Sequence, residues 1–139
     1  MLRALEREQP AFCFFLGDGE RDLAALRRRF PELPVYAVRG NCDMRSALPG
    51  ELHCAVAGVS VFAAHGHLLN VKYDPALEEL RAAAPEAEVL LYGHTHVARC
   101  ERIGGQLLLN PGAIGWAEPP CYALLWLGEG EIRAELKTL

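Results

Sequence analysis

The chain has 139 residues, of which 51% are hydrophobic, and a formal net charge of −4 at pH 7. This length is typical of one domain, and the apolar content is enough for a buried core without disulfides or other staples. The mild negative charge and the scattered arginines, apart from the run 27–29, indicate no electrostatic footprint for a nucleic-acid partner.

The cysteines are odd in number and widely spaced, without a C-x-x-C pair: Cys13, Cys42, Cys54, Cys100 and Cys121. This favours free thiols in a reducing cytoplasm over a disulfide framework. The first ten residues carry charges throughout, and no run approaches the ~18 apolar residues of a membrane span. We therefore expect a cytoplasmic protein with no targeting segment and no membrane contact.

The first half of the chain predicts helices that alternate with strands. Residues 1–10 form an amphipathic pattern that ends at a proline, although no polar residue caps the first turn. The apolar run 11–16 predicts a buried strand, and residues 20–30 predict a second amphipathic helix. Residues 34–39 predict another strand, after which 52–58 and 58–67 suggest a hairpin.

The second half begins with a helical stretch at 75–85 and a strand at 87–93. From residue 106 the pattern becomes strand, loop, strand, a Gly-Glu-Gly turn and an alternating strand, which predicts a β-meander. Because no repeat or low-complexity linker interrupts the chain, we expect one domain over residues 1–139.

Four of the predicted strands end in short polar clusters: Gly17-Asp18-Gly19, Gly40-Asn41-Cys42-Asp43, His65-Gly66-His67 and Gly93-His94-Thr95-His96. In an α/β sheet the carboxyl ends of the strands meet at one edge, so these clusters should converge. Carboxylate, carboxamide oxygen and imidazole are ligands for divalent metals such as Mn²⁺, Fe²⁺, Co²⁺ and Zn²⁺. In an extended segment, residues two apart face the same side, so both histidines of each pair should point at the cluster.

Each residue also has a plain structural interpretation when taken alone. Asp18 and Asn41 beside glycines are common turn residues, and His65 or His67 could be a satisfied histidine at the edge of the core. His53 stands apart from the pairs and is interpreted as a surface or strand-edge histidine. The combination of four strand ends, each with ligand-type residues, favours a metal site.

The order Gly-Asp, Gly-Asn-x-Asp, His-Gly-His and Gly-His-x-His, followed by Asn-Pro-Gly at 110–112, resembles the calcineurin-like metallophosphoesterases. The resemblance is to their small prokaryotic phosphodiesterase branch in particular, and it extends from about Phe12 to Leu139. It implies a four-layer α/β/β/α sandwich with a two-metal centre at its edge. By the resemblance, Asp18 matches the bridging carboxylate. The remaining ligands of one metal match Asn41, His65 and His94, and His96 matches a ligand of the other metal.

Two departures from the family pattern limit the transfer. The family's first strand ends in an Asp-x-His motif that supplies further ligands to the metal of His96, and this chain has no such motif. We therefore expect an N-terminally truncated domain, for which a start at an internal methionine is a better explanation than a degenerate paralogue. Unpaired sheet edges would then invite oligomerisation.

The second departure concerns proton transfer. Many family members have histidine where this chain has Cys42, whose thiol, with a reference pKa of about 8.5, is a poor acid at neutral pH. His67 or a metal-bound water would have to replace it, and Cys42 is expected to pack rather than act as a nucleophile. Asp43 is expected to orient a neighbour. Trp116 fits either a pocket wall or an interface, whereas Trp126 is expected in the core.

The implied function is metal-dependent hydrolysis of a phosphodiester by metal-bound hydroxide, with Asn41 and His67 as tentative catalytic residues. Mn²⁺ is the preferred cofactor, with Fe²⁺, Co²⁺, Ni²⁺ or Zn²⁺ as alternatives, and the expected partner is a small phosphoester. Because only Asp18 and His96 remain for the second metal, we expect weak or absent activity of this chain. The alternative is a non-catalytic scaffold or protein-binding module of the same fold.

Overall fold

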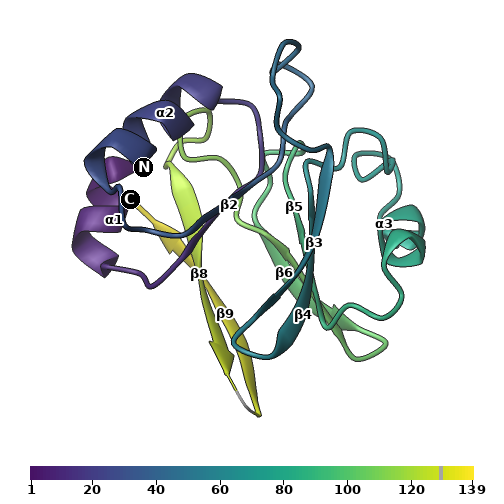
Figure 1. The fold of residues 1–139 in the computed structure, drawn as a ribbon. Coiled ribbons are helices and arrows are strands. Elements are labelled where there is room, and N and C mark those ends of the chain that lie inside the picture. The colour runs from purple at the N-terminus through teal and green to yellow at the C-terminus, as the bar shows by residue number, and fades with distance from the viewer. Residues whose placement is uncertain (129) are drawn as a thin grey trace.

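A computed structural model describes residues 1–128 and 130–139 and contains helices, strands and a cluster of loops at one edge (Figure 1). The elements in chain order are α1 (Leu2–Glu8), β1 (Cys13–Phe15), α2 (Glu20–Arg29), β2 (Val35–Ala37), β3 (Glu51–Val56), β4 (Val59–Ala64), α3 (Glu78–Ala83), β5 (Val89–Tyr92), β6 (Arg99–Ile103), β7 (Gln106–Asn110), β8 (Cys121–Gly128) and β9 (Glu131–Thr138).

The larger sheet has five strands in the order β3-β4-β5-β7-β6. Its three central strands, β4, β5 and β7, run parallel, and the two edge strands are antiparallel to their neighbours. Nearly every residue of the central strands is buried, as expected for parallel strands covered on both faces. Their sequences are correspondingly continuous apolar runs rather than alternating ones.

The second sheet layer consists of two ladders, the parallel pair β1–β2 and the antiparallel pair β8–β9. Within the described ranges no backbone ladder joins these two pairs. Side chains from this layer, Phe14 and Leu125 among them, pack against Val61, Leu91 and Leu109 of the larger sheet and form the core between the sheets.

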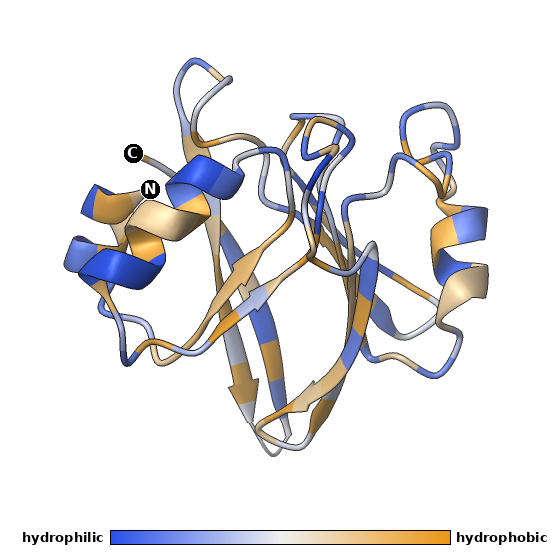
Figure 2. Cartoon of the chain, turned by 45° about the horizontal axis from the view of Figure 1, so that its top comes forward, coloured by the Kyte–Doolittle hydropathy of each residue, from blue (hydrophilic) through white to orange (hydrophobic). Residues whose placement is uncertain are grey.

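Helices cover the two outer faces and complete four layers, which Figure 1 shows from left to right as α1 with α2, the two ladders, the five-stranded sheet, and α3. Leu80 of α3 packs with Phe62, Leu90 and Leu108 in a second core. Figure 2 shows hydrophobic colour on the central strands and hydrophilic colour on the outer faces of the helices. The predicted mixed α/β sandwich is confirmed.

The C-terminal third differs from the predicted β-meander. The strand β7 joins the larger sheet beside β5, and only β8 and β9 form a hairpin. The strand β6 was not predicted, because its charged sequence Arg-Cys-Glu-Arg-Ile follows the histidine loop without a clear start. It is an edge strand with alternating burial, where one charged face meets solvent.

The helix predicted at the N-terminus is confirmed and ends at Gln9, whose backbone is left-handed with φ 46°. No described helix is both long and apolar enough to cross a bilayer. The strands β4, β5 and β7 end at the upper edge in Figure 1, where the loops 38–50, 65–77, 93–98 and 111–120 gather. The topology therefore brings the predicted polar clusters to one edge of the sandwich.

Candidate metal centre

His65 is the central side chain of this edge. It follows β4 directly, is 2% exposed, and its Nδ1–H donates a hydrogen bond to the carbonyl oxygen of Leu16 at 2.6 Å. Because a carbonyl only accepts, this bond assigns a proton to Nδ1 and turns Nε2 towards the other polar side chains of this edge. His65 thus presents Nε2 in the manner of a histidine held for metal binding.

Three further donor atoms approach Nε2 of His65. Asn41 Oδ1 lies 3.0 Å away and Asp18 Oδ2 lies 3.3 Å away. His94 Nδ1 lies 3.2 Å away. The structure therefore brings together all four residues that the sequence assigned to one metal.

The oxygen atoms of Asn41 and Asp18 are acceptors, and both present lone pairs to Nε2 of His65 at these distances. A single proton on Nε2 satisfies one of them at a time, whereas a divalent cation satisfies all. Adjacent ligands of one ion at about 2.0–2.2 Å lie about 3 Å apart, which is close to the separations of these three atoms from His65 Nε2. The donor set therefore fits a divalent metal in its chemistry.

The four donor side chains do not yet form a complete metal site. Within the part of the chain that the structure describes, no three His, Cys, Asp or Glu side chains are arranged as a ready group of metal ligands. The donors contact one another in pairs around His65. Small side-chain movements at Asp18 and His94 would have to open space for an ion between them.

The imidazole of His67 lies beside this group. Its ring centroid is 5.3 Å from that of His65 and 6.1 Å from that of His94. Its Nδ1 is buried and has no hydrogen-bond partner among the described residues. Burial, reinforced by the neighbouring imidazole of His65, lowers the pKa of both His67 and His94. Both rings are therefore biased towards the neutral form that binds metal.

The backbone of the ligand loops is left-handed at several non-glycine residues. Asp18, His94 and His96 have φ of 61°, 64° and 59°. The prediction that the histidine pairs lie on extended backbone is therefore wrong, since Gly66 is also left-handed and the Thr95 N–H donates to the carbonyl oxygen of Gly93. Such conformations cost about 1 kcal/mol or more each and cluster at functional sites.

This conformation separates the two histidines of the second pair. His94 is half-buried and contacts His65, whereas His96 is exposed and shows no contact with the cluster among the described residues. The resemblance assigned His96 to a different metal from His94, and the side chain of His96 is exposed in the structure. Its role as a ligand stays a prediction.

Two glycines allow the loops after β1 and β2 to touch. A Cβ at Gly17 would lie 2.5 Å from the backbone nitrogen of Gly40 and 2.8 Å from His65 Nδ1. A Cβ at Gly40 would overlap the carboxylate of Asp18. Only glycine permits this approach, which sets the positions of Asp18 and Asn41 against His65.

Asp43 holds the same two loops together. Its carboxylate is buried and accepts hydrogen bonds from four backbone N–H groups: Asp18 at 2.7 Å, Gly40 at 2.9 Å, Gly19 at 3.2 Å and Glu20 at 3.3 Å. Burial alone would raise the pKa of Asp43, but these bonds lower it overall. The expectation that Asp43 orients its neighbours rather than binding metal agrees with this geometry.

Cys42 is exposed beside the cluster. Its backbone N–H donates to Asp18 Oδ1 at 2.8 Å, and the amide of Asn41 donates to its sulfur at 3.4 Å. The negative charge of Asp18 raises the pKa of the Cys42 thiol. A thiol that ionises less readily is less nucleophilic at neutral pH, in agreement with the expectation that Cys42 is not a nucleophile. The expectation that Cys42 packs in the interior is wrong, because the residue is exposed.

Asn110, at the end of β7, has a positioning role that the sequence showed only as a turn motif. It is fully buried, and its amide donates to the carbonyl oxygen of Gly93 and to Thr95 Oγ1, both at 3.0 Å. These bonds fix the loop that carries His94. By contrast, His53 is exposed on the edge strand β3 and packs on Phe62, as predicted.

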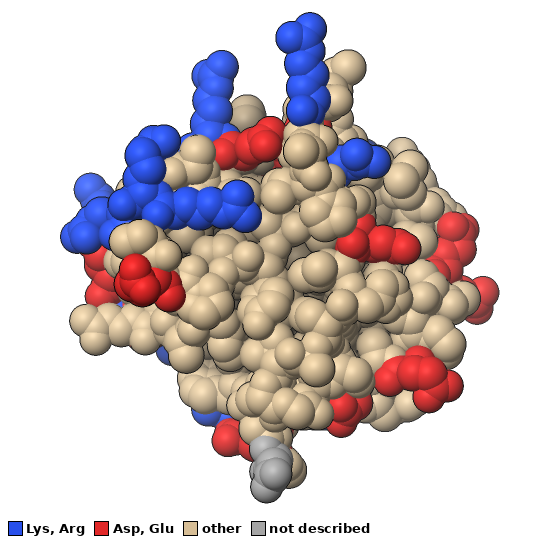
Figure 3. Space-filling model, in the orientation of Figure 1, with Lys and Arg blue, Asp and Glu red and all other residues tan. Residues whose placement is uncertain are grey.

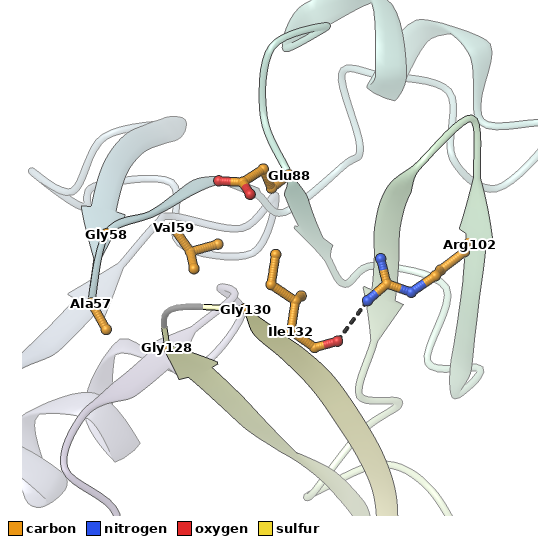
Figure 4. Close-up of a pocket in the computed structure, with 8 residues that line it drawn as sticks. All are labelled: Ala57, Gly58, Val59, Glu88, Arg102, Gly128, Gly130 and Ile132. Atoms are coloured by element: carbon orange, nitrogen blue, oxygen red, sulfur yellow. Dashed lines mark hydrogen bonds between the residues drawn. The ribbon is translucent and has the colours of Figure 1, made fainter.

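A cavity of about 410 Å³ lies away from the cluster, between the β3–β4 turn and the β8–β9 hairpin (Figure 4). Its charged residues already have partners: Glu88 accepts from the Ser60 N–H at 2.9 Å, and Arg102 donates to the carbonyl oxygen of Ile132 at 2.6 Å. Among the described residues that line it, no group of ligand-type side chains is found.

Residues 1–130 match the Calcineurin-like phosphoesterase superfamily domain, and the chain belongs to this superfamily. The probable metallophosphoesterase YsnB of Bacillus subtilis is 36% identical over 99 residues, which are 70% of this chain and 56% of YsnB. The phosphodiesterase YfcE of Escherichia coli K12 is 32% identical over 103 residues, 66% of this chain and 52% of YfcE. The chain thus spans about half the length of these curated relatives.

Solved structures agree with the fold. A predicted phosphoesterase from Streptococcus pneumoniae superimposes with a TM-score of 0.80 at 26% identity, covering 98% of this chain and 79% of that one. Vps29 of Entamoeba histolytica, solved in complex with Zn²⁺, superimposes with a TM-score of 0.69 at 19% identity and covers 99% of this chain and 89% of its own. The second likeness concerns the fold alone.

Proposed function

We propose that the protein is a metal-dependent phosphoesterase that hydrolyses phosphodiesters. The observation that carries the proposal is the convergence of Asp18, Asn41 and His94 on Nε2 of His65. Membership of the superfamily and the names of YsnB and YfcE support the reaction class.

Asp18, Asn41, His65 and His94 would hold one divalent cation, and His96 together with Asp18 would contribute to a second. Mn²⁺ is the first candidate, and Fe²⁺, Co²⁺, Ni²⁺ and Zn²⁺ suit the same mixture of oxygen and imidazole ligands. Bound cations of this kind neutralise phosphoryl charge and lower the pKa of a water ligand. In this proposal Asp18 would contribute to both sites; its Oδ2 lies 3.3 Å from His65 Nε2, and its Oδ1 accepts from the Cys42 N–H.

The proposed catalytic residues are Asn41 and His67. Asn41 is exposed and positions its carboxamide oxygen against His65. His67 carries a buried and unpartnered Nδ1 next to the cluster, so it has a nitrogen free for proton transfer with a leaving group. Because burial lowers its pKa, the protonated form of His67 is scarce at neutral pH, and slow turnover is expected.

Slow turnover is also expected from the second metal site. Among the described residues its ligand candidates are Asp18 and His96, and the side chain of His96 is exposed. We further propose a cytoplasmic location, consistent with five free cysteines, and a small phosphoester as partner. The two unjoined ladders of the second layer favour a homo-oligomer as the working state.

The test combines activity with metal content. The protein loaded with Mn²⁺ is assayed with bis(4-nitrophenyl) phosphate, and metal content is measured by elemental analysis before and after dialysis. We expect weak, Mn²⁺-dependent turnover that disappears in His94→Ala and survives in His53→Ala, the matched histidine outside the cluster. Turnover that persists in His94→Ala, or none together with no retained metal, would overturn the proposal.

A scaffold is the second candidate, and one observation favours it. The described residues contain no ready group of three His, Cys, Asp or Glu ligands, so the edge could have lost its metal and kept only its fold. Elemental analysis separates the two candidates. Near-stoichiometric transition metal supports the enzyme, whereas a metal-free protein that binds a partner tightly supports the scaffold.

A further inference from the structure

Large apolar side chains are strongly exposed at the same edge as the His65 cluster. Five of them, between 66% and 91% exposed, form what we name the apolar rim: Met44, Leu68, Tyr73, Val97 and Trp116. Elsewhere in the described ranges, only Leu136 and Leu139 belong to this class, at 38% and 42%. Exposed apolar residues scattered singly need no explanation, but a concentration at one edge marks a binding surface.

Each rim residue is carried by a loop that also carries part of the cluster or follows one of its strands. Leu68 directly follows His67, and Val97 directly follows His96. Met44 follows the Asn41–Asp43 segment, while Trp116 belongs to the loop after β7. These loops lie along the upper edge in Figures 1 and 2. A molecule held at the cluster would therefore lie among the loops that carry the rim.

Basic residues accompany the rim. Lys72 lies in the loop 65–77, which also carries His67, and Arg39 lies in the loop 38–50, which also carries Asn41. The Lys72 ammonium also lies 5.7 Å from the ring centre of Tyr73. Figure 3 shows basic side chains standing at the upper edge as well as over α1 and α2. The edge therefore combines apolar area with a few positive charges.

This combination of apolar area and positive charge favours some phosphodiester substituents over others. A diester carries one negative charge, which the cluster and its cations would hold, and two substituents that leave the phosphorus across the surrounding loops. Sugar or polyol substituents would need hydrogen-bonding groups, whereas the rim offers mainly side chains that gain by excluding water. The two aromatic members, Tyr73 and Trp116, favour a flat ring as the substituent.

We propose that the apolar rim binds an aromatic substituent of the substrate, so that the site prefers aryl phosphodiesters over those with small or polar substituents. This inference rests on the proposed phosphodiesterase function. It assigns the rim to the ester substituent and the cluster to the phosphate.

The experiment compares two substrates with the same leaving group, methyl 4-nitrophenyl phosphate and phenyl 4-nitrophenyl phosphate, in Mn²⁺-loaded protein. The readout is the ratio of their kcat/KM values, because the intrinsic reactivity of each substrate cancels between variants. We expect the phenyl-to-methyl ratio to fall about fivefold to tenfold in Trp116→Ser or Tyr73→Ser, within the range of hydrophobic discrimination. Leu136→Ser, an exposed leucine away from the rim, is the matched control.

A ratio that stays unchanged in both rim variants, or that falls equally in Leu136→Ser, overturns the inference. Rim variants that alter sedimentation of the protein without changing the ratio would instead assign the surface to a second protein, which also overturns it.

A binding experiment distinguishes failure of the proposed function from failure of the inference about the apolar rim. If neither ester is hydrolysed, phenyl and methyl esters of methylphosphonic acid are titrated into Mn²⁺-loaded Trp126→Phe, in which Trp116 is the remaining fluorophore. A saturable fluorescence change with the phenyl ester and at least fivefold weaker binding of the methyl ester support the rim, although the catalytic proposal would be lost. Equal affinity for the two esters overturns the rim.

Discussion

Asp43 Oδ2 accepts a hydrogen bond from the backbone N–H of Asp18 at 2.7 Å, although the two residues lie 25 positions apart. The same oxygen accepts from Gly40 at 2.9 Å, so one buried carboxylate ties the loop after β1 to the loop after β2. The relative position of Asp18 and Asn41 therefore depends on a residue whose side chain is not among the proposed metal ligands.

The variant Asp43→Asn tests this dependence. The carboxamide would keep one acceptor oxygen, but its NH₂ group would face backbone N–H groups that then lack a partner. We expect a loss of about 2–3 kcal/mol in the free energy of unfolding, measured by urea denaturation, and weaker Mn²⁺ binding. Asp22→Asn, a change on the outer helix α2, is the control. Equal stability of the Asp43 and Asp22 variants would contradict the account.

The lowered pKa of Asp43 predicts how stability depends on pH. Since the folded state favours the ionised carboxylate, its contribution is fully present above the unfolded value of about 3.9 and is lost as pH falls through the lower folded pKa. The stability difference between the wild type and Asp43→Asn should therefore shrink as pH falls from ~5 to ~2. A difference that is constant over this range would show that the charge contributes nothing.

His67 and His94 make the stability of the fold depend on pH in a higher range than Asp43 does. Burial lowers their pKa in the folded protein, so the unfolded chain binds more protons between the folded values and the reference value of about 6.5. Metal-free protein should lose stability as pH falls below ~6.5, and His67→Gln should lose less. Thermal denaturation between pH 8 and pH 5 in the presence of a chelator measures the effect. Identical pH profiles for the variant and the wild type would contradict it.

The close approach of Gly17 and Gly40 gives a steric prediction. In Gly40→Ala the new methyl group would overlap the Asp18 carboxylate and force it away from His65. We expect reduced stability and at least tenfold weaker Mn²⁺ binding. The control is Gly115→Ala, where the added Cβ meets no atom within 4 Å among the described residues. Metal affinity that is equal in the two variants would exclude this role of Gly40.

The sequence predicted the gathering of the ligand residues for a physical reason. Strands 11–16, 34–39, 58–67 and 87–93 end in polar clusters, and parallel strands bring such ends to one edge whatever the details of the loops. This reasoning places Asp18, Asn41, His65 and His94 together without any knowledge of their side-chain geometry.

The same reasoning did not predict the local geometry of the loops. The left-handed backbone at His94 and His96 turns the pair apart, and it is held by the buried amide of Asn110, which lies in a different strand. The four hydrogen bonds of Asp43 likewise depend on two loops meeting in space. Patterns within one segment do not contain such contacts, because tertiary packing creates them.

The central claim is that opposing lone pairs around His65 form a site for a divalent cation, and isothermal titration with Mn²⁺ tests it most directly. The account predicts about one Mn²⁺ bound per chain, with binding abolished or at least tenfold weaker in His65→Gln and in His94→Gln and unchanged in His53→Gln. Absence of Mn²⁺ binding by the wild type, or equal binding by all three variants, would contradict it.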